Sequence, residues 1–171
     1  AGNGPITFNN QIDSTGNRNL TLNNQGALSF KTMGLNGNLG DVDITNASNG
    51  FSATSVNAKS LTNSGAPLSG AVSVTGAQVY TDFLQLSTAT NKDIIFGGSV
   101  TAKNQGITLN SGGKLTVTNL NATTITNGDI SLTHNGALTL NGDIQSGDTF
   151  TESTTSNTTI TIGTGVGVGI S

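Results

Sequence analysis

The stretch that decides the fold is residues 20–30, LTLNNQGALSF, in which an Asn/Gln/Gly turn separates two apolar–polar–apolar tripeptides. The same arrangement returns at residues 107–117 and 130–140. Alternation with a period of two places the outer residues of a tripeptide on one face of a strand and the middle residue on the other. A strand this short cannot bury enough apolar surface alone, so it needs similar strands stacked on both sides. Each tripeptide pair is therefore predicted to be a rung of a solenoid.

Equivalent apolar positions recur every 22 or 23 residues along the chain, a period that is typical of solenoids. Dividing 171 residues by 22 gives between seven and eight coils. No stretch has the i, i+3, i+4, i+7 spacing of an amphipathic α-helix over more than two turns. We therefore predict an all-β fold, a single-stranded parallel β-helix (β-solenoid) of about seven to eight coils of 22–23 residues. The spaced pairs are Ile6 and Leu28, Leu20 and Val42, Val72 and Ile94, Leu138 and Ile160 (22 residues), and Leu61 and Leu84, Leu84 and Ile107, Ile107 and Ile130, Leu115 and Leu138 (23 residues).

The pattern also predicts which side chains face solvent. Residues 47–70 follow it less regularly, although Phe51, Val56 and Leu61 continue the inward set. Residues 146–157 are rich in Ser and Thr, and we expect them to leave the stack. The middle residues of the tripeptides should form a flat, mostly uncharged outer face: Thr7, Thr21, Ser29, Asp43, Ser73, Gln85, Thr108, Thr116, Ser131, Thr139 and Thr161.

The two ends of the chain resemble each other. The closing segment 165–171, GVGVGIS, is similar to the opening segment 2–7, GNGPIT. If Ile170 takes the place of Ile6, the repeating unit has 164 residues (170 − 6). We therefore expect residues 1–171 to be a single β-solenoid segment and one unit of a longer tandem array, with neighbouring repeats of the same polypeptide as its partners.

The composition excludes several classes of function. Charged residues make up 9% of the chain, where about 25% is usual, and the formal net charge is only −3. Six scattered basic residues argue against binding to nucleic acid. No apolar run approaches the roughly 20 residues of a membrane helix, so this segment is not expected to insert into a membrane. The absence of cysteine excludes disulfides and thiolate metal sites.

Asp41 and Asp43 place two carboxylates on one strand face, and polysaccharide lyases built on β-helices use Asp clusters to hold calcium. That chemistry requires further carboxylates on neighbouring coils and a Lys or Arg base. An offset of one 22-residue coil instead gives neutral neighbours on both sides, namely Asn63, Gly65, Asn19 and Thr21. We therefore expect the two carboxylates to belong to a solvated surface.

His134 is the only histidine of the chain, and its Thr-His-Asn-Gly context indicates a solvated turn. A nucleophilic Ser needs a paired base, and with this single histidine the Ser residues of the chain lack one. Asp129, Asp143 and Asp148 lie next to Gly and are expected in turns. The sequence predicts no catalytic, cofactor-binding or metal-binding residue, no cofactor and no enzymatic activity.

Two sets of polar residues suggest surface ladders. Asn residues that follow strands are predicted to form stacked amide ladders along a corner: Asn9, Asn23, Asn110 and Asn141. Thr-x-Thr triplets at 116–118, 124–126 and 159–161 raise ice binding as an alternative function. An ice face needs two Thr columns in register. One column persists through Thr116, Thr139 and Thr161, whereas Thr118 is followed by Asn141 and Gly163.

Four segments carry a resemblance to a known family: GPITFNN at 4–10, NLTLN at 19–23, GAQVY at 76–80 and DIIFGGSV at 93–100. They resemble repeats of giant bacterial surface adhesins, the filamentous-haemagglutinin-like and autotransporter-like exoproteins. The resemblance implies a right-handed parallel β-helix, export through the outer membrane, and a role in attachment or cell–cell contact. It carries over no site residue, because such repeats have no catalytic signature.

These observations lead to one expected function and two alternatives. The expected function is a structural or adhesive segment of a secreted or cell-surface adhesin, a stiff spacer or a contact surface for host-cell or other cell-surface receptors or glycans. The first alternative is a polysaccharide-active enzyme on the same architecture. The second is an ice-binding solenoid.

Overall fold

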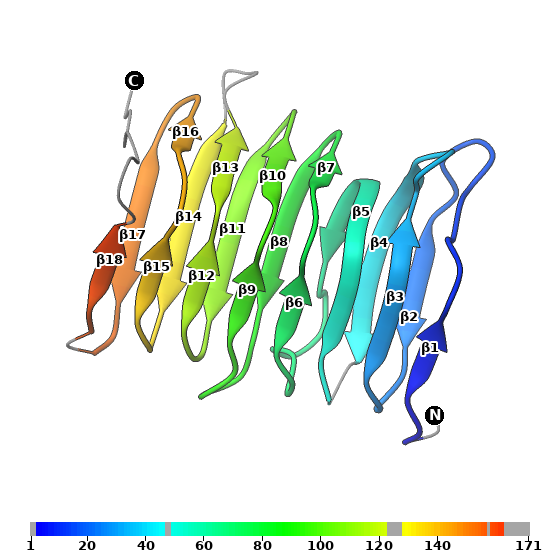
Figure 1. Cartoon of the computed structure of the whole chain (residues 1–171), viewed down its shortest axis with the longest axis horizontal. Helices are drawn as coiled ribbons and strands as arrows, with labels where there is room; N and C mark the ends of the chain where they lie inside the picture. Colours follow the sequence, from blue (N-terminus) through cyan, green and yellow to red (C-terminus); the bar gives the residue numbers. More distant parts are fainter. Residues whose placement is uncertain (1–2, 47–48, 123–127, 157, 163–171) are drawn as a thin grey trace.

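The computed structural model describes residues 3–46, 49–122, 128–156 and 158–162. These residues form a stack of parallel strands with no helix, and the coils follow one another along the long axis from the N-terminal end to the C-terminal end (Figure 1). None of them forms a helix of the length and apolar character needed to cross a membrane. The protein is a parallel β-solenoid of about seven turns, as predicted.

Most coils contribute strands to three parallel sheets. The first sheet contains β1 (Ile6–Phe8), β3 (Leu28–Met33), the start of β5 (Phe51–Thr62), β6 (Val72–Val74), β9 (Ile94–Phe96), β12 (Leu115–Val117), β15 (Leu138–Leu140) and β18 (Ile160–Ile162). The second contains the middle of β5, β7 (Gln78–Tyr80), β10 (Ser99–Ala102), β13 (Asn119–Ala122) and β16 (Ile144–Ser146). The third contains β2 (Leu20–Asn23), β4 (Leu39–Asn46), the end of β5, β8 (Phe83–Ser87), β11 (Gly106–Ser111), β14 (Asp129–His134) and β17 (Phe150–Thr154).

The strand register confirms the predicted period. Leu20 pairs with Val42, and Leu84 pairs with Leu61 on one side and Ile107 on the other. The other predicted pairs are partners as well. Like residues therefore stack directly over one another along the axis, as the spacing of the apolar tripeptides requires.

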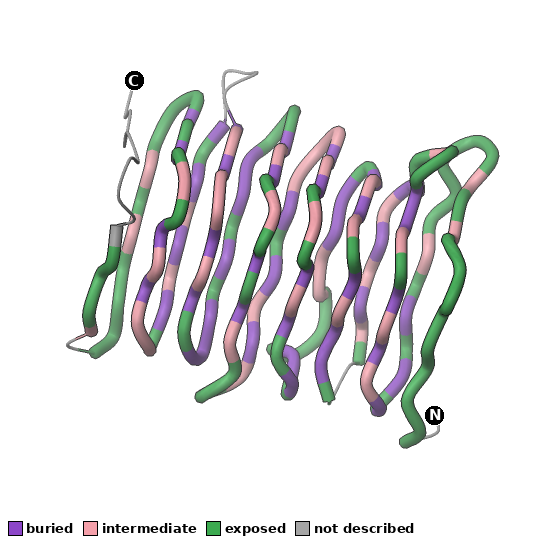
Figure 2. The backbone as a smooth tube through the Cα atoms, in the orientation of Figure 1, coloured by how far each residue is buried: buried purple, intermediate pink, exposed green. Residues whose placement is uncertain are grey.

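The core is a narrow apolar interior enclosed by the three sheets. Buried and exposed positions alternate along most strands (Figure 2), so that the flanking residues of each tripeptide point inward. Phe51, Val56 and Leu61 are all buried, which confirms that they continue the inward set. The predicted outer residues, from Thr7 to Thr161, are all half-buried or exposed.

Corners between sheets use two different solutions. Gly34 ends β3 with a φ of 75°, and a Cβ atom there would meet the carbonyl oxygen of Asn57 on the next coil, so only glycine fits. β5 instead runs without interruption through all three sheets. Because β5 has no separate turn residues at its corners, the coil from Val42 to its strand partner Leu61 takes only 19 residues (61 − 42).

The prediction that residues 146–157 leave the stack is wrong for the described part of that segment; residue 157 lies outside it. β17 pairs in register with β14 from Phe150 to Thr154. The apolar pattern is interrupted in β17, because Glu152 takes the inward position over Leu132 and Thr154 takes the position over His134. The similarity of residues 165–171 to the chain start also concerns residues outside the described part, so the tandem array stays a prediction.

Candidate functional site

Asp41 and Asp43 lie on the outer side of β4, and groups of the following coil hydrogen-bond to both carboxylates. Ser60 Oγ donates to Asp41 Oδ1 at 2.9 Å, and Lys59 Nζ lies 3.2 Å from the same oxygen. The backbone N–H and the hydroxyl of Ser64 donate to the Asp43 carboxylate at 2.9 and 2.6 Å. The hydrogen bond from Ser60 lowers the pKa of Asp41; partial burial opposes this effect, and Lys59 adds to it.

At this site, the predicted offset of 22 residues between neighbouring coils is wrong. The strand partners of Asp41 and Asp43 are Ser60 and Thr62, 19 residues further on, and not the residues 22 further on. The uninterrupted course of β5 causes the difference. Within the described ranges, no three His, Asp or Glu side chains come close enough together to hold a metal ion. The two carboxylates accept hydrogen bonds from neutral hydroxyl groups where a calcium site would need further carboxylates.

His134 is fully buried, so the prediction of a solvated turn histidine is wrong. Its Nδ1 lies 2.6 Å from the carbonyl oxygen of Gly136, an arrangement in which Nδ1–H donates. Its Nε2 lies 2.8 Å from Glu152 Oε1 on the next coil. The alternation of Ile130, Leu132 and His134 along β14 is the sequence signal that indicates an inward direction.

His134 belongs to a column of polar side chains at the corner that follows the third sheet. Ser111, its strand partner in the preceding coil, is also fully buried and donates from Oγ to the carbonyl oxygen of Lys114 at 2.7 Å. Thr88 donates in the same way to the carbonyl oxygen of Lys92 at 2.6 Å. These side chains close the turn into the next coil, so the column has a structural role.

A second buried polar pair interrupts the apolar core. The Tyr80 hydroxyl donates to Gln78 Oε1 at 2.7 Å, and neither side chain is exposed. Burial raises the pKa of Tyr80 above its ordinary value. Gln78 Nε2 has no hydrogen-bond partner among the described residues. The pair lies inside the stack and presents no reactive group to solvent.

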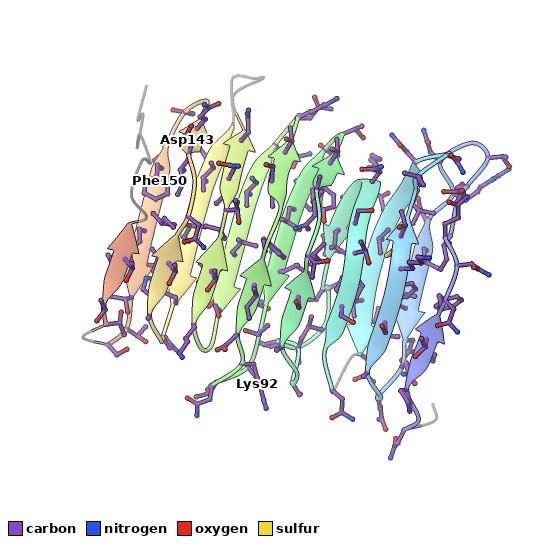
Figure 3. All side chains as sticks on the ribbon, in the orientation of Figure 1. Lys92, Asp143 and Phe150 are labelled. Carbon is purple, nitrogen blue, oxygen red and sulfur yellow. The ribbon has the colours of Figure 1, made fainter. Side chains whose placement is uncertain are left out.

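An amide ladder does exist, but on residues other than the four predicted. On the outer side of the second sheet, Asn119 Nδ2 donates to Ser99 Oγ at 3.0 Å, while Asn119 Oδ1 accepts the backbone N–H of Asp143 at 2.8 Å. Asn121 Nδ2 donates to Gln145 Oε1 at 3.3 Å. We name these five residues the amide ladder. Figure 3 shows Asp143 beside β16, towards the C-terminal end of the stack.

The predicted ladder residues do not form one column. Asn9 and Asn141 follow strands of the first sheet in the first and seventh coils. Asn23 pairs with Asn46 in the third sheet. Asn110 lies in the third sheet between Ser87 and Thr133. The reason is that Asn follows strands at more than one corner, so its position after a strand does not specify the sheet.

The Thr columns on the first sheet agree with the sequence. Thr116, Thr139 and Thr161 pair in register on the outer side. Thr118 instead donates its hydroxyl to the carbonyl oxygens of Phe96 and Gly97, at 3.2 and 3.0 Å. The second column that an ice face requires is therefore not formed at Thr118; residues 124–126 lie outside the described ranges.

The outer surface has open depressions between neighbouring coils. One lies over the amide ladder and is lined by Ser99, Asn121 and Gln145 among others. Another surrounds the turn before β9, from which Lys92 projects at the lower edge of the stack (Figure 3). Their linings are mostly polar and include the charged residues Asp143 in the first depression and Lys92 and Asp93 in the second, which suits hydrogen bonding to a polar partner.

Comparisons with protein-family models, curated proteins and solved structures found no match for this chain. The fold and the arrangement of outer side chains are therefore the basis for the function proposed below.

Proposed function

We propose that this chain is a structural and adhesive segment of a secreted or cell-surface bacterial adhesin, where it acts as a stiff spacer and offers its outer faces for contact. The observation that carries the proposal is the in-register pairing of the first sheet from β1 to β18. Seven strand spacings of about 4.8 Å give a rod about 35 Å long. A longer array of such segments would project a binding site away from a cell surface.

Stiffness follows from how the coils are joined. Each coil contacts only its neighbours, and backbone hydrogen bonds between coils run along the rod. Apolar columns add to these bonds: Phe8 stacks on Phe30 with ring centroids 4.9 Å apart, and Phe30 packs against Phe51 at 5.7 Å. Bending the rod would separate hydrogen-bonded strands on one side, so bending is opposed in every coil.

The amide ladder supports a role in contact. Its donors and acceptors lie on the outer face of three consecutive coils, held in place by hydrogen bonds from one coil to the next. Prearranged amide groups lose little conformational freedom when they bind, and they match the hydroxyl groups of glycans or the backbone of a protein partner. Four of the five ladder side chains are neutral, and Asp143 takes part through its backbone N–H, so the face offers mainly hydrogen-bonding groups.

The first test concerns location. Antibodies raised against the chain should label intact source cells without permeabilisation. Labelling that appears only after lysis would contradict a secreted or surface-exposed protein.

The second test concerns contact. Beads coated with the purified chain should attach to cultured cells or glycan arrays more than beads coated with an unrelated protein. The double substitution Asn121→Ala and Gln145→Ala should reduce attachment, whereas Thr108→Ala and Ser131→Ala, on the outer side of the third sheet, should not. Attachment that is equal for both variants would exclude the amide ladder as the contact face.

A further inference from the structure

The N-terminal end of the stack exposes side chains that the same columns bury elsewhere. Ile6 and Phe8 are each 40% exposed, whereas their partners Leu28 and Phe30 are 1% and 4% exposed. No described strand pairs with the other edge of β1. Open strand edges with apolar side chains are surfaces on which a further strand can pair.

The backbone of β1 indicates how such a strand would pair. Ile6 N–H donates to the carbonyl oxygen of Ala27 at 2.9 Å, so Ile6 faces β3. In a parallel strand, the next residue directs its N–H and C=O to the opposite neighbour. The N–H of Thr7 is therefore directed to the open edge, and a partner strand there would receive it.

At the C-terminal end of the described residues, β18 pairs with β15 on one edge, and no described strand pairs with its other edge. β18 repeats the apolar–polar–apolar pattern of β1, and its Ile160 is 47% exposed. The N–H of Leu138 donates to the carbonyl oxygen of Thr159 at 3.1 Å, which places β18 in the same relation to β15 as β3 has to β1. By the same alternation, Ile160 and Ile162 direct their backbone groups away from the stack.

Charge also differs between the two ends. Residues 3–40 contain Arg18 and Lys31 against Asp13, a net charge of +1. Residues 115–162 contain four acidic residues, Asp129, Asp143, Asp148 and Glu152, and no Lys or Arg, a net charge of −4. The residues between them balance at zero, with four acidic and four basic residues. The ends of two molecules placed head to tail would therefore attract each other, whereas two C-terminal ends would repel.

We propose that β1 of one molecule pairs with β18 of a second copy, with Ile6 over Ile160 and Thr7 over Thr161, so that the first sheet continues from one molecule into the next. Such a contact joins two different surfaces, and repetition of it builds an open filament. The inference does not depend on the proposed adhesive function, since it rests on the two ends of the stack and not on its outer faces.

The first experiment measures mass by sedimentation velocity over a range of concentrations. The unmodified chain should show a mass that rises with concentration, and added salt should weaken the association. Thr7→Pro removes the N–H on the open edge and leaves the bonds from β1 to β3, so association should weaken by about tenfold or more. Thr7→Val is the matched control and should associate as the unmodified chain does. A monomer at every concentration, or a Thr7→Pro variant that associates normally, would overturn the proposal.

The second experiment tests the register and does not depend on how Thr7→Pro folds. The chain has no cysteine, so the double substitution Thr7→Cys and Thr161→Cys introduces the only two thiols. Neighbouring strands bring paired Cα atoms to about 4.8 Å, within the range of a disulfide. Mild oxidation should give a ladder of covalent oligomers for the double variant and none for either single variant. Efficient dimers of Thr7→Cys alone would show head-to-head contact instead and would overturn the proposal.

Discussion

The central coils and the end coils share one strand pattern but differ in how much of it they bury. Val72, Ile94 and Phe96 in the centre are fully buried, whereas Ile6 and Ile160, in the same columns as Val72 and Ile94, are 40% and 47% exposed. Figure 2 shows the same contrast, since the first strand and the last two are largely exposed. Burial in this fold therefore depends on having a coil on both sides and not on the residue alone.

The largest expected difference between centre and end comes from two Phe residues. Phe51→Ala should lower the free energy of unfolding by about 3–5 kcal/mol, because Phe51 is 1% exposed and its removal leaves a cavity. Phe8→Ala should cost about 1 kcal/mol, since water already reaches that side chain and mainly the stacking on Phe30 is lost. Urea unfolding followed by circular dichroism measures both. Equal costs would mean that the first coil is as well packed as the third.

The second prediction concerns the polar pair His134–Glu152, which joins β14 and β17 of two neighbouring coils near the C-terminal end. Glu152→Leu restores the apolar character of the Leu132 column but removes the partner of His134 Nε2. We expect a loss of about 1–3 kcal/mol, because a buried nitrogen is left unpaired. Glu152→Gln, the matched control, keeps a hydrogen-bonding group at that place and should cost less. The double variant His134→Leu, Glu152→Leu should recover much of the loss; no recovery would mean that the pair is not coupled.

Tyr80 provides an alkaline test of the central coils. Its pKa is raised by burial, so the folded state holds its proton at pH values where the unfolded state, with a pKa of about 10, releases it. The contribution of Tyr80 to stability is therefore fully present below about pH 10 and should decrease by up to about 1.4 kcal/mol per pH unit above it. Tyr80 is the only tyrosine, so its ultraviolet absorbance reports ionisation directly. Ionisation of Tyr80 in a chain that stays folded would contradict its burial.

The smallest effect is expected at the surface of the second coil. The pKa of Asp41 is lowered, chiefly by the hydrogen bond from Ser60. Its contribution to stability is present above the ordinary Asp pKa of about 3.9 and is lost as the pH falls through the lower folded value. Because the Asp41 side chain is 41% exposed, the contribution should be below about 1 kcal/mol. The stability difference between the unmodified chain and Asp41→Asn should shrink between about pH 5 and pH 2, that is, from about one unit above to about two units below the ordinary Asp pKa; a constant difference would exclude this role.

The apolar pattern predicted most of the fold. The period and the strand partners follow from Leu, Ile, Val and Phe alone, because a one-residue slip would move every apolar side chain to the wrong face. The pattern failed at β17, where Glu152 takes an inward place that only its pairing with His134 explains. It also failed at Asp41, because the length of the coil there depends on whether β5 bends at its corners. Both failures concern contacts between coils, which no local stretch of sequence contains.

The candidate contact face was less accessible to sequence reasoning. The idea of an amide ladder is right in kind, but Asn119 and Asn121 form it where Asn23 and Asn110 were expected. The tripeptide Asn119-Leu120-Asn121 reverses the usual order, because its first and third residues are polar and its middle residue is apolar. That reversal marks two adjacent outward amides on one strand, and it would have located the ladder.

The short rise of each coil has a mechanical consequence. The 22 residues from Ile6 to Leu28 advance the stack by one strand spacing of about 4.8 Å. Pulled straight, the same 22 residues reach about 75 Å. A coil that peels from one end under tension therefore releases about 70 Å of slack while the rest of the stack stays intact. A tether made of such coils would absorb a sudden load in steps.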